Sequence, residues 1–451
     1  MELQWVKKPT CNECGQEFNE PFLWCPHCNN LISIQPIKGP QKSKINLKSM
    51  WSLNPFLPKF SEIASLVEGN TPIIQIRNIP EIKDVNIKLE FRNPTSSFRD
   101  RASSLIVSDA LSKKSKEIIG ASTGSFSISL AAYASQAALK STTFIPGNLD
   151  LSKIEQLKMY GTKIIDTNKN LDEAIKSAKN YTLEKKGYFP IPNDNLLTIE
   201  GQKTIGLELI LQLKDIDNVI IPRGSGTLLL SIYRGFEDAI ESGWISKFPK
   251  IFAVSLKSSS SSHFAESLEM KAPPLINQIK KIIKKTHGKE ISIDALDMIK
   301  DASEVAMKEG LFIEPASASV ISAAKNLTPK DINPQKTVAI LTGSGLNALN
   351  KFAFRMRNLK KTVWGLSETS TRRFEILNII AENKNTTHGY AIWASLGKKK
   401  TIQSIYHHLD SLNQDGLIKF QEVGNTKKCI ITNKGIDILN KMREIIDLRE
   451  I

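Results

Sequence analysis

Four cysteines near the amino terminus have the spacing of a metal site. Cys11, Cys14, Cys25 and Cys28 form two C-x2-C pairs that are separated by ten residues. Two such knuckles can present four thiolates tetrahedrally to zinc, and four protein ligands leave no open coordination position. We therefore expect a structural zinc ribbon over residues 1–34. Two disulfides, disfavoured where no secretion signal is visible, and reduced core cysteines are the alternatives.

Three glycine-bearing loops have the composition of anion-binding sites. They are ASTGSFSIS (121–129), IPRGSGTLLL (221–230) and LTGSGLN (341–347). In the second, Gly224, Ser225, Gly226 and Thr227 pass directly from a strand into a helix, so backbone N–H groups and two hydroxyls can surround a phosphate. Each loop alone is a weak signal, because many strand-to-helix turns need glycine.

A cation stands at a fourth strand-to-helix junction, KLEFRNPTSSFRDRASSL (88–105). A short apolar strand over residues 87–91 is followed by an Asn-Pro break and then by a helix with Arg99 in its first turn. A helix start attracts anions, so a positive side chain there opposes the helix dipole. Arg99 therefore needs a reason other than helix stability.

The elements that position these loops predict an α/β body over residues 35–354. Between residues 86 and 346, helical segments of ten or more residues alternate with seven strand-like runs, NIKLEF, KEIIGA, STTFIP, TKIID, NVIIP, KIFAVS and KTVAIL. This alternation predicts βαβ units and parallel sheets with helices on both faces. The ligand site of such a fold lies at the carboxyl ends of the strands.

Seven motifs in this body resemble, in order and spacing, the threonine synthases, which are pyridoxal-phosphate enzymes of the tryptophan-synthase-β fold. The motifs are EGNTP (68–72), FRNPTSSFRDR (91–101), STGSFSISLAAYA (122–134), EGQKTIG (200–206), GSGTLLLSIYRGF (224–236), EPASAS (314–319) and TGSGL (342–346). Some members of that family also resemble this chain in having an amino-terminal zinc ribbon. The resemblance implies a two-domain, parallel-sheet body of pyridoxal-phosphate fold type II.

The same resemblance assigns site residues and reveals departures from the family pattern. Arg99 matches the lysine that forms the Schiff base, and Ser125 stands where an asparagine lies beside the pyridine ring. The resemblance implies that Gly224, Ser225, Gly226 and Thr227 hold the cofactor phosphate and that Thr342 meets the pyridine nitrogen. Asn347 follows Gly345 and Leu346 where the family has lysine.

A guanidinium stays protonated and delocalised, so Arg99 cannot form an internal aldimine. No lysine lies between Lys88 and Lys113 to replace it. Pyridoxal phosphate can then bind only without that covalent bond. We expect Arg99 to recognise a carboxylate or a second anionic group of a ligand; turning to solvent or pairing with an acid such as Asp100 are the alternatives.

The last segment, residues 366–451, reads as helix, short helix, helix, hairpin, helix, and it resembles a winged helix-turn-helix of the PadR type. Ile402, Ile405, Leu409 and Leu412 fall on one helical face. DNA binding would use outward residues of that helix and basic residues around it, namely Gln403, Ser404, His407, Lys398, Lys399, Lys400, Lys427 and Lys428. A winged helix used only for dimerisation or substrate docking is the alternative.

Charge supports DNA binding only in part. The chain carries a formal charge of +15, of which the last segment holds 13 Lys and Arg against 10 Asp and Glu. Much of the positive charge lies in the body, including KKIIKK (280–285), which is typical of a solvated helix face. Since no apolar run approaches twenty residues, we expect a cytoplasmic protein with no membrane partner. A homodimer is expected because two-fold symmetry would suit both the body and the winged helix.

Two functions follow from these patterns. The first is a transcription regulator in which a catalytically silent body senses a small phosphorylated or amino-acid ligand and a winged helix binds double-stranded DNA. The second is an active enzyme, converting phosphohomoserine to threonine or performing a related replacement, with an accessory winged helix. Arg99 favours the first, because site chemistry outranks fold analogy.

Overall fold

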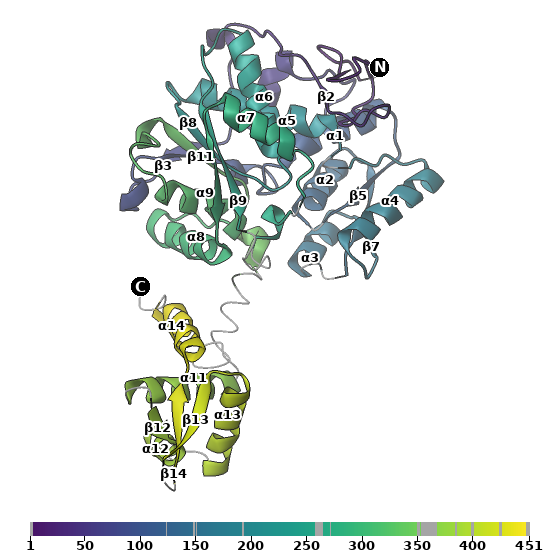
Figure 1. Cartoon of the computed structure of the whole chain (residues 1–451). Helices are drawn as coiled ribbons and strands as arrows, with labels where there is room; N and C mark the ends of the chain where they lie inside the picture. Colours follow the sequence, from purple (N-terminus) through teal and green to yellow (C-terminus); the bar gives the residue numbers. More distant parts are fainter. Residues whose placement is uncertain are drawn as a thin grey trace. The chain divides into compact units, whose positions relative to one another are not determined.

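The computed structural model describes residues 3–122, 124–147, 149, 151–191, 194–257, 265–270, 272–349, 352, 368–383, 386–397, 401–423 and 426–447. The chain divides into two compact units, Met1–Leu349 and Asn350–Ile451 (Figure 1). Among the described residues, no helix is both long and apolar enough to cross a bilayer.

The larger sheet of the first unit has six strands in the order β10-β9-β8-β11-β4-β3. Its strands are β3 (Ile73–Gln75), β4 (Asn86–Leu89), β8 (Asn218–Pro222), β9 (Lys250–Leu256), β10 (Lys289–Ile293) and β11 (Thr337–Leu341). All neighbours pair in parallel except β3, which runs antiparallel to β4 at the edge. The central strands β8 and β11 are buried along their whole length, as strands covered on both faces must be.

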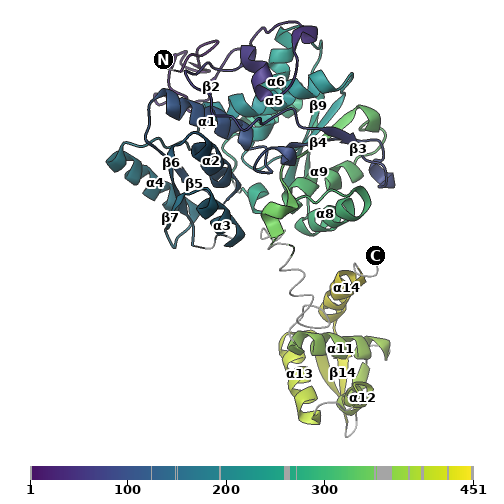
Figure 2. The same cartoon turned by 180° about the vertical axis from the view of Figure 1, so that it is seen from behind.

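Helices cover both faces of this sheet (Figures 1 and 2). They are α5 (Leu196–Gln212), α6 (Thr227–Glu241), α7 (Ile276–Lys285), α8 (Ala295–Glu309) and α9 (Pro315–Lys325). Val219 and Ile221 of β8 share one hydrophobic core with α5, α6 and α7, and α9 contacts the sheet from the other side. The alternation of apolar strands and helices in the sequence therefore predicted this α/β architecture correctly.

A smaller parallel sheet, in the order β5-β6-β7, forms the second part of the body. It consists of β5 (Glu117–Ala121), β6 (Lys140–Ile145) and β7 (Lys163–Asp166), with α1 (Asp100–Ser112), α2 (Ser125–Gln136), α3 (Leu151–Met159) and α4 (Leu171–Lys185). Helix α4 packs on one face through Ala174 and Ala178, and α2 and α3 pack on the other through Ile128 and Leu157. All seven strand-like runs of the sequence are strands in the structure.

The cysteine-bearing segment belongs to the first unit and is docked on α5. Strands β1 (Thr10–Cys11) and β2 (Ile32–Ser33) pair antiparallel. The amide of Leu196, the first residue of α5, donates to the carbonyl of Pro21 at 2.8 Å, and the amide of Leu23 donates to the carbonyl of Asp194 at 3.2 Å. These main-chain bonds fix the segment against the start of the helix.

A buried ion-pair network joins β4, α1 and α5. The fully buried Arg101 guanidinium donates to both carboxylate oxygens of Glu90, at 2.7 and 2.8 Å, and to both of Glu208, at 2.6 and 2.8 Å. Lys88 Nζ adds a bond to Glu208 Oε2 at 2.7 Å. Burial acts to raise the pKa of Glu208, but Arg101 and Lys88 lower it to about 2. Two cations and two carboxylates are therefore matched, which buried charges require.

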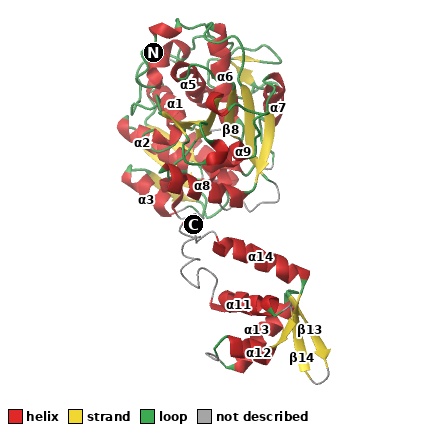
Figure 3. Cartoon of the chain, turned by 90° about the vertical axis from the view of Figure 1, so that its left-hand side faces the viewer, coloured by secondary structure: helices red, strands yellow, loops and turns green. Residues whose placement is uncertain are grey.

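Among the described residues, the second unit contains a three-stranded antiparallel sheet and the helices α11 to α14 (Figure 3). Its elements are α11 (Glu368–Glu382), β12 (Thr386–His388), α12 (Gly389–Ser395), α13 (Ile402–Gln414), β13 (Ile418–Val423), β14 (Thr426–Ile431) and α14 (Asn433–Asp447). Ile405, Leu409 and Leu412 of α13 are buried in its core, as their spacing predicted. Strand β12 was not predicted from the sequence.

Replacing Arg101 with methionine is expected to lower the free energy of unfolding by about 3–5 kcal/mol, because two buried carboxylates lose their principal partner. Denaturant unfolding of full-length protein would measure the change. Lys158→Met is a control, because Lys158 is exposed and pairs with exposed Glu155 at 2.8 Å; it is expected to cost less than about 1 kcal/mol. Similar losses in the two variants would contradict a special role for the network.

Candidate functional site

Three loops meet at one edge of the six-stranded sheet because they follow three neighbouring parallel strands. Strand β11 lies between β4 and β8, with Leu341 opposite Leu89 and Ala339 opposite Ile220. The loop ending at Arg99 follows β4, the loop beginning at Thr342 follows β11, and Gly224 to Thr227 follow β8. The structure thus brings Arg99, Thr342 and the predicted phosphate loop to the carboxyl ends of adjacent strands, where α/β folds bind ligands.

Arg99 is the residue directly before helix α1, rather than a member of its first turn. Strand β4 ends at Leu89, two residues earlier than predicted, and a 3-10 turn (Glu90–Arg92) follows it. Ser96 then adopts left-handed backbone angles, with φ 59°. This tight path turns the chain from the strand into α1 and presents the Arg99 side chain beside the edge of the sheet.

Hydrogen bonds tie the Arg99 loop to the Thr342 loop. The amide of Phe98 donates to the carbonyl of Thr342 at 3.1 Å, and the amide of Ser344 donates to the carbonyl of Ser96 at 3.2 Å. The Asn347 side-chain amide donates to the carbonyls of Thr95 and Ser96, at 3.3 Å each. Asn347 therefore serves to hold the two loops together.

Arg99 is partly buried, and its guanidinium lies over the Phe98 ring, 5.1 Å from the ring centroid. Burial lowers the pKa of Arg99, and the nearby Glu314 carboxylate opposes that shift. Among the described residues, no side chain or carbonyl accepts a hydrogen bond from this guanidinium. A cation with five N–H donors is thus available at the edge of the sheet where a ligand would bind.

Asp100 does not pair with Arg99, which excludes one alternative raised by the sequence. Its carboxylate accepts bonds from the Thr95 amide at 2.7 Å, from the Thr95 hydroxyl and from Ser129 Oγ at 2.6 Å. Burial raises the pKa of Asp100 to about 6, against these hydrogen bonds. Asp100 therefore anchors the start of α1 to the loop and to α2.

Glu314, which lies in the EPASAS motif, reaches the Thr342 loop. A Cβ placed on Gly343 would lie 2.4 Å from Glu314 Oε1, so the Glu314 carboxylate packs directly against this glycine. Ser317 Oγ accepts a bond from the Gly343 amide at 2.7 Å and lies 2.9 Å from Thr342 Oγ1. Sequence reasoning assigned no role to Glu314; its charge and its motif were the available signals.

The predicted phosphate loop has the geometry of a helix start. Gly226, with φ 95°, precedes α6, a helix of 15 residues that begins at Thr227. Ser225 Oγ lies 2.5 Å from Thr227 Oγ1, so the two hydroxyls stand together. First-turn N–H groups of a helix have no partner within the helix, and they attract anions. Gly224, Ser225, Gly226 and Thr227 therefore fit a phosphate group.

The loop after β5 contains a feature that the sequence did not suggest. Ser125 begins α2, and the ring of Phe126 is buried in the core. A Cβ placed on Gly124 would lie 2.7 Å from Lys153 Nζ, so this lysine of α3 packs against the loop. No local pattern around Lys153 indicated the contact, because it depends on how α3 packs beside α2.

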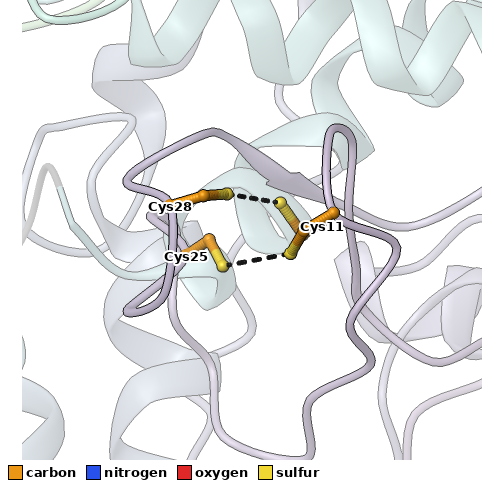
Figure 4. A group of neighbouring side chains, drawn as sticks. Cys11, Cys25 and Cys28 are labelled. Atoms are coloured by element: carbon orange, nitrogen blue, oxygen red, sulfur yellow. Dashed lines mark hydrogen bonds between the residues drawn. The ribbon is translucent and has the colours of Figure 1, made fainter.

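The four predicted zinc ligands lie together. The sulfur atoms of Cys11, Cys14, Cys25 and Cys28 are all within 4.8 Å of one another. Figure 4 shows Cys11, Cys25 and Cys28 around a common centre, with Cys11 Sγ 3.4 Å from Cys28 Sγ. A backbone hydrogen bond from Asn30 lowers the pKa of Cys28 to about 6, whereas a backbone hydrogen bond from Gln16 is outweighed by the neighbouring thiols, which raise the pKa of Cys14 to about 12. The cluster is compatible with tetrahedral zinc, since thiolates are the binding form.

The structure places some of the predicted DNA-contacting residues on accessible surface. Gln403 and His407 of α13 are exposed and Ser404 is partly exposed. Lys427 and Lys428 lie on β14, and Lys427 Nζ is 4.1 Å from the Phe420 ring centroid. Lys398, Lys399 and Lys400 lie outside the described residues.

Comparisons with known proteins identify relatives of the first unit. Residues 64–343 match the family model described as "Pyridoxal-phosphate dependent enzyme". Threonine synthase of Methanocaldococcus jannaschii is 30% identical over 375 residues, covering 74% of this chain and 92% of that protein. Threonine synthase of Bacillus sp. is 33% identical over 317 residues, covering 66% and 89%.

This chain belongs to the threonine synthase family of pyridoxal-phosphate dependent enzymes. Solved structures support the fold of this family member: O-ureido-L-serine synthase gives a TM-score of 0.55 at 18% identity, covering 63% of this chain and 92% of that chain. Cysteine synthase of Entamoeba histolytica gives 0.53 at 21% identity, covering 62% and 87%.

The site of this threonine synthase homologue fits one part of pyridoxal phosphate and not another. The helix start at Gly224 to Thr227 offers N–H groups and hydroxyls to its phosphate, and the Thr342 hydroxyl, 2.9 Å from Ser317 Oγ, lies at the end of the neighbouring strand β11. Arg99 is the basic side chain at the start of α1. Its guanidinium stays protonated, so it does not condense with the cofactor aldehyde to form a Schiff base. The residues present therefore suit noncovalent binding.

We predict one tightly held zinc ion per chain. Cys11→Ser removes one of four thiolates and is expected to release the metal, which metal analysis of carefully reduced protein would detect. Cys429→Ser is the matched control, because Cys429 is a buried cysteine of the second unit, and zinc content should be unchanged. Reduced wild-type protein without zinc, or zinc retained in Cys11→Ser, would contradict the prediction.

Proposed function

We propose that the body of this protein binds a phosphorylated ligand noncovalently and does not catalyse threonine synthesis. Arg99 carries this proposal, because the family resemblance puts it where the Schiff-base lysine belongs. The pKa of a guanidinium is too high for it to act as a free amine, and its charge is delocalised. Transaldimination and proton transfer would lose the lysine that performs them.

Arg99 has the chemistry for recognition. Its partly buried guanidinium has no hydrogen-bond acceptor among the described residues, although the Glu314 carboxylate lies near enough to favour its positive charge. A carboxylate, or two oxygens of a second phosphate group, would accept two parallel hydrogen bonds from the Arg99 guanidinium. Together with the phosphate loop, this predicts a ligand with two anionic groups, such as a phosphorylated amino acid, or pyridoxal phosphate itself.

A second candidate function is threonine synthase activity, and it is favoured by the similarity to named threonine synthases over three quarters of this chain. Pyridoxal phosphate would supply the electron sink for that chemistry. Incubating full-length protein with phosphohomoserine and pyridoxal phosphate, and measuring threonine and released phosphate, separates the two functions. Catalytic turnover by wild-type protein would overturn the noncatalytic proposal.

We further propose that the second unit is a winged helix-turn-helix that binds double-stranded DNA. The order of α12, α13, β13 and β14 supports this, and so does the polar, exposed face of α13. A homodimer would present two such units to two half-sites. Ligand binding in the body would then regulate DNA binding, and a docking role for the unit is the competing outcome.

Arg99→Ala is expected to weaken noncovalent binding of phosphohomoserine at least tenfold, because a charged hydrogen-bonding partner is worth about 1.5–3 kcal/mol. Isothermal titration calorimetry would measure it. Arg92→Ala is a matched control, since the Arg92 guanidinium also lies over the preceding phenylalanine, 5.5 Å from the Phe91 centroid, but its side chain is exposed. Equal affinity in wild type, Arg99→Ala and Arg92→Ala would refute recognition by Arg99.

Lys428→Glu is expected to weaken binding of full-length protein to duplexes of any sequence and to reduce the slope of affinity against salt concentration, because a phosphate contact releases a counterion. Fluorescence anisotropy at several salt concentrations would measure both. Lys179→Glu changes net charge equally, at an exposed position of α4 in the first unit, and should have little effect. Salt-insensitive or absent DNA binding in wild type would favour the docking role.

A further inference from the structure

A polar cavity lies at the amino-terminal edge of the six-stranded sheet. It has a volume of about 600 Å³ and is lined by the starts of β8 and β9, the end of α7 and the loop of residues 329–333. Strand β8 begins in this cavity at Asn218 and ends at Pro222, shortly before the phosphate loop. The cavity and the candidate site therefore lie at opposite ends of one strand. Its volume is in the range of small-molecule sites.

Basic side chains dominate the lining of this cavity. Lys247, Lys250, Lys285 and Lys330 contribute four ammonium groups, against the carboxylates of Asp217 and Asp331. Lys250 and Lys330 form no ion pair with any of the described residues. These two ammonium groups are therefore available to a ligand.

Both carboxylates of the lining are paired with lysines, one of which, Lys247, also lines the cavity. Asp331 pairs with Lys289 and accepts bonds from the amide and hydroxyl of Thr328, at 3.1 and 2.8 Å. Asp217 lies 3.7 Å from Lys247 Nζ and 3.9 Å from Lys336 Nζ. Both carboxylates are therefore paired, and the excess positive charge of the lining comes from Lys250 and Lys330.

An aromatic ring lies beside these cations. Phe248 is partly buried in the lining, and it stacks on Tyr233 with centroids 5.0 Å apart. Lys285 Nζ lies 4.9 Å from the Phe248 centroid and 3.7 Å from a carboxylate oxygen of Glu237, which orients it at the rim. The cavity therefore combines an apolar ring surface with ammonium groups, although the lysines of α7 read in the sequence as a solvated face only.

We propose that this cavity is a second ligand site, which binds a small molecule with a phosphate group and an apolar ring, of the nucleoside phosphate class. Lys250 and Lys330 would hold the phosphate oxygens as point charges, and Phe248 would contact the ring. This site is independent of the ligand proposed for the Arg99 region, because it uses the opposite edge of the sheet.

Calorimetric titration of full-length protein with ADP tests the proposal. Saturable binding is expected, and the double variant Lys250→Glu, Lys330→Glu should weaken it at least tenfold. The control is Lys176→Glu, Lys179→Glu, which makes the same charge change at exposed positions of α4 and should keep the affinity within twofold. Absence of saturable binding, or equal weakening in the two double variants, would overturn the proposal.

Two further measurements show where ADP binds and whether its ring contributes to the affinity. Ser225→Asp places a carboxylate in the phosphate loop; ADP affinity should be unchanged, whereas its loss would put ADP in the candidate site and refute the second site. Pyrophosphate should bind more weakly than ADP, because it lacks the ring. Equal affinity for the two would overturn the part of the proposal that assigns a ring contact to Phe248.

Discussion

Arg101 is a buried charged side chain, and its two bidentate carboxylate partners, Glu90 and Glu208, fix the positions of the segments around it. Glu90 follows β4 and Glu208 lies on α5, so one guanidinium fixes the start of α1 relative to both. The preceding residue, Asp100, is held by Thr95 and Ser129. Arg99 is the next residue toward the amino terminus, and its backbone is consequently held in place while its side chain remains available. These buried side chains thereby position Arg99, whose guanidinium has no hydrogen-bond acceptor among the described residues.

Sequence patterns predicted the α/β body, its seven principal strands, the cysteine cluster and the buried face of α13, because each depends on local periodicity or spacing. Strand β10 was missed, since most of Lys289–Ile293 is exposed at the edge of the sheet and its sequence has no apolar run. The contacts of Lys153 with Gly124 and of Glu314 with Gly343 join distant segments, so no local pattern contains them. The engagement of Asp100 by Ser129 was hidden for the same reason.

Family membership and site chemistry lead to different functions for this chain. The relatives and the phosphate loop indicate a pyridoxal-phosphate site, and the fold supports it. Arg99 keeps the positive charge of the family lysine and removes its nucleophilic amine. Our proposal is that a site altered in this way keeps anion recognition and loses covalent attachment, so that the body senses a ligand. Under the same proposal, the exposed polar face of α13 would bind DNA in response.

Borohydride trapping with pyridoxal phosphate, followed by peptide mass spectrometry, addresses the role of Arg99 most directly. Wild-type protein and Arg99→Lys would be incubated with the cofactor, reduced and digested, with absorbance spectra recorded before reduction. We predict a pyridoxyl group at position 99 in Arg99→Lys, with the corresponding absorbance band, and no stoichiometric label on any one lysine of the wild type. Stoichiometric labelling of one wild-type lysine, such as Lys153, would contradict noncovalent binding. It would favour threonine synthase activity, the second candidate function.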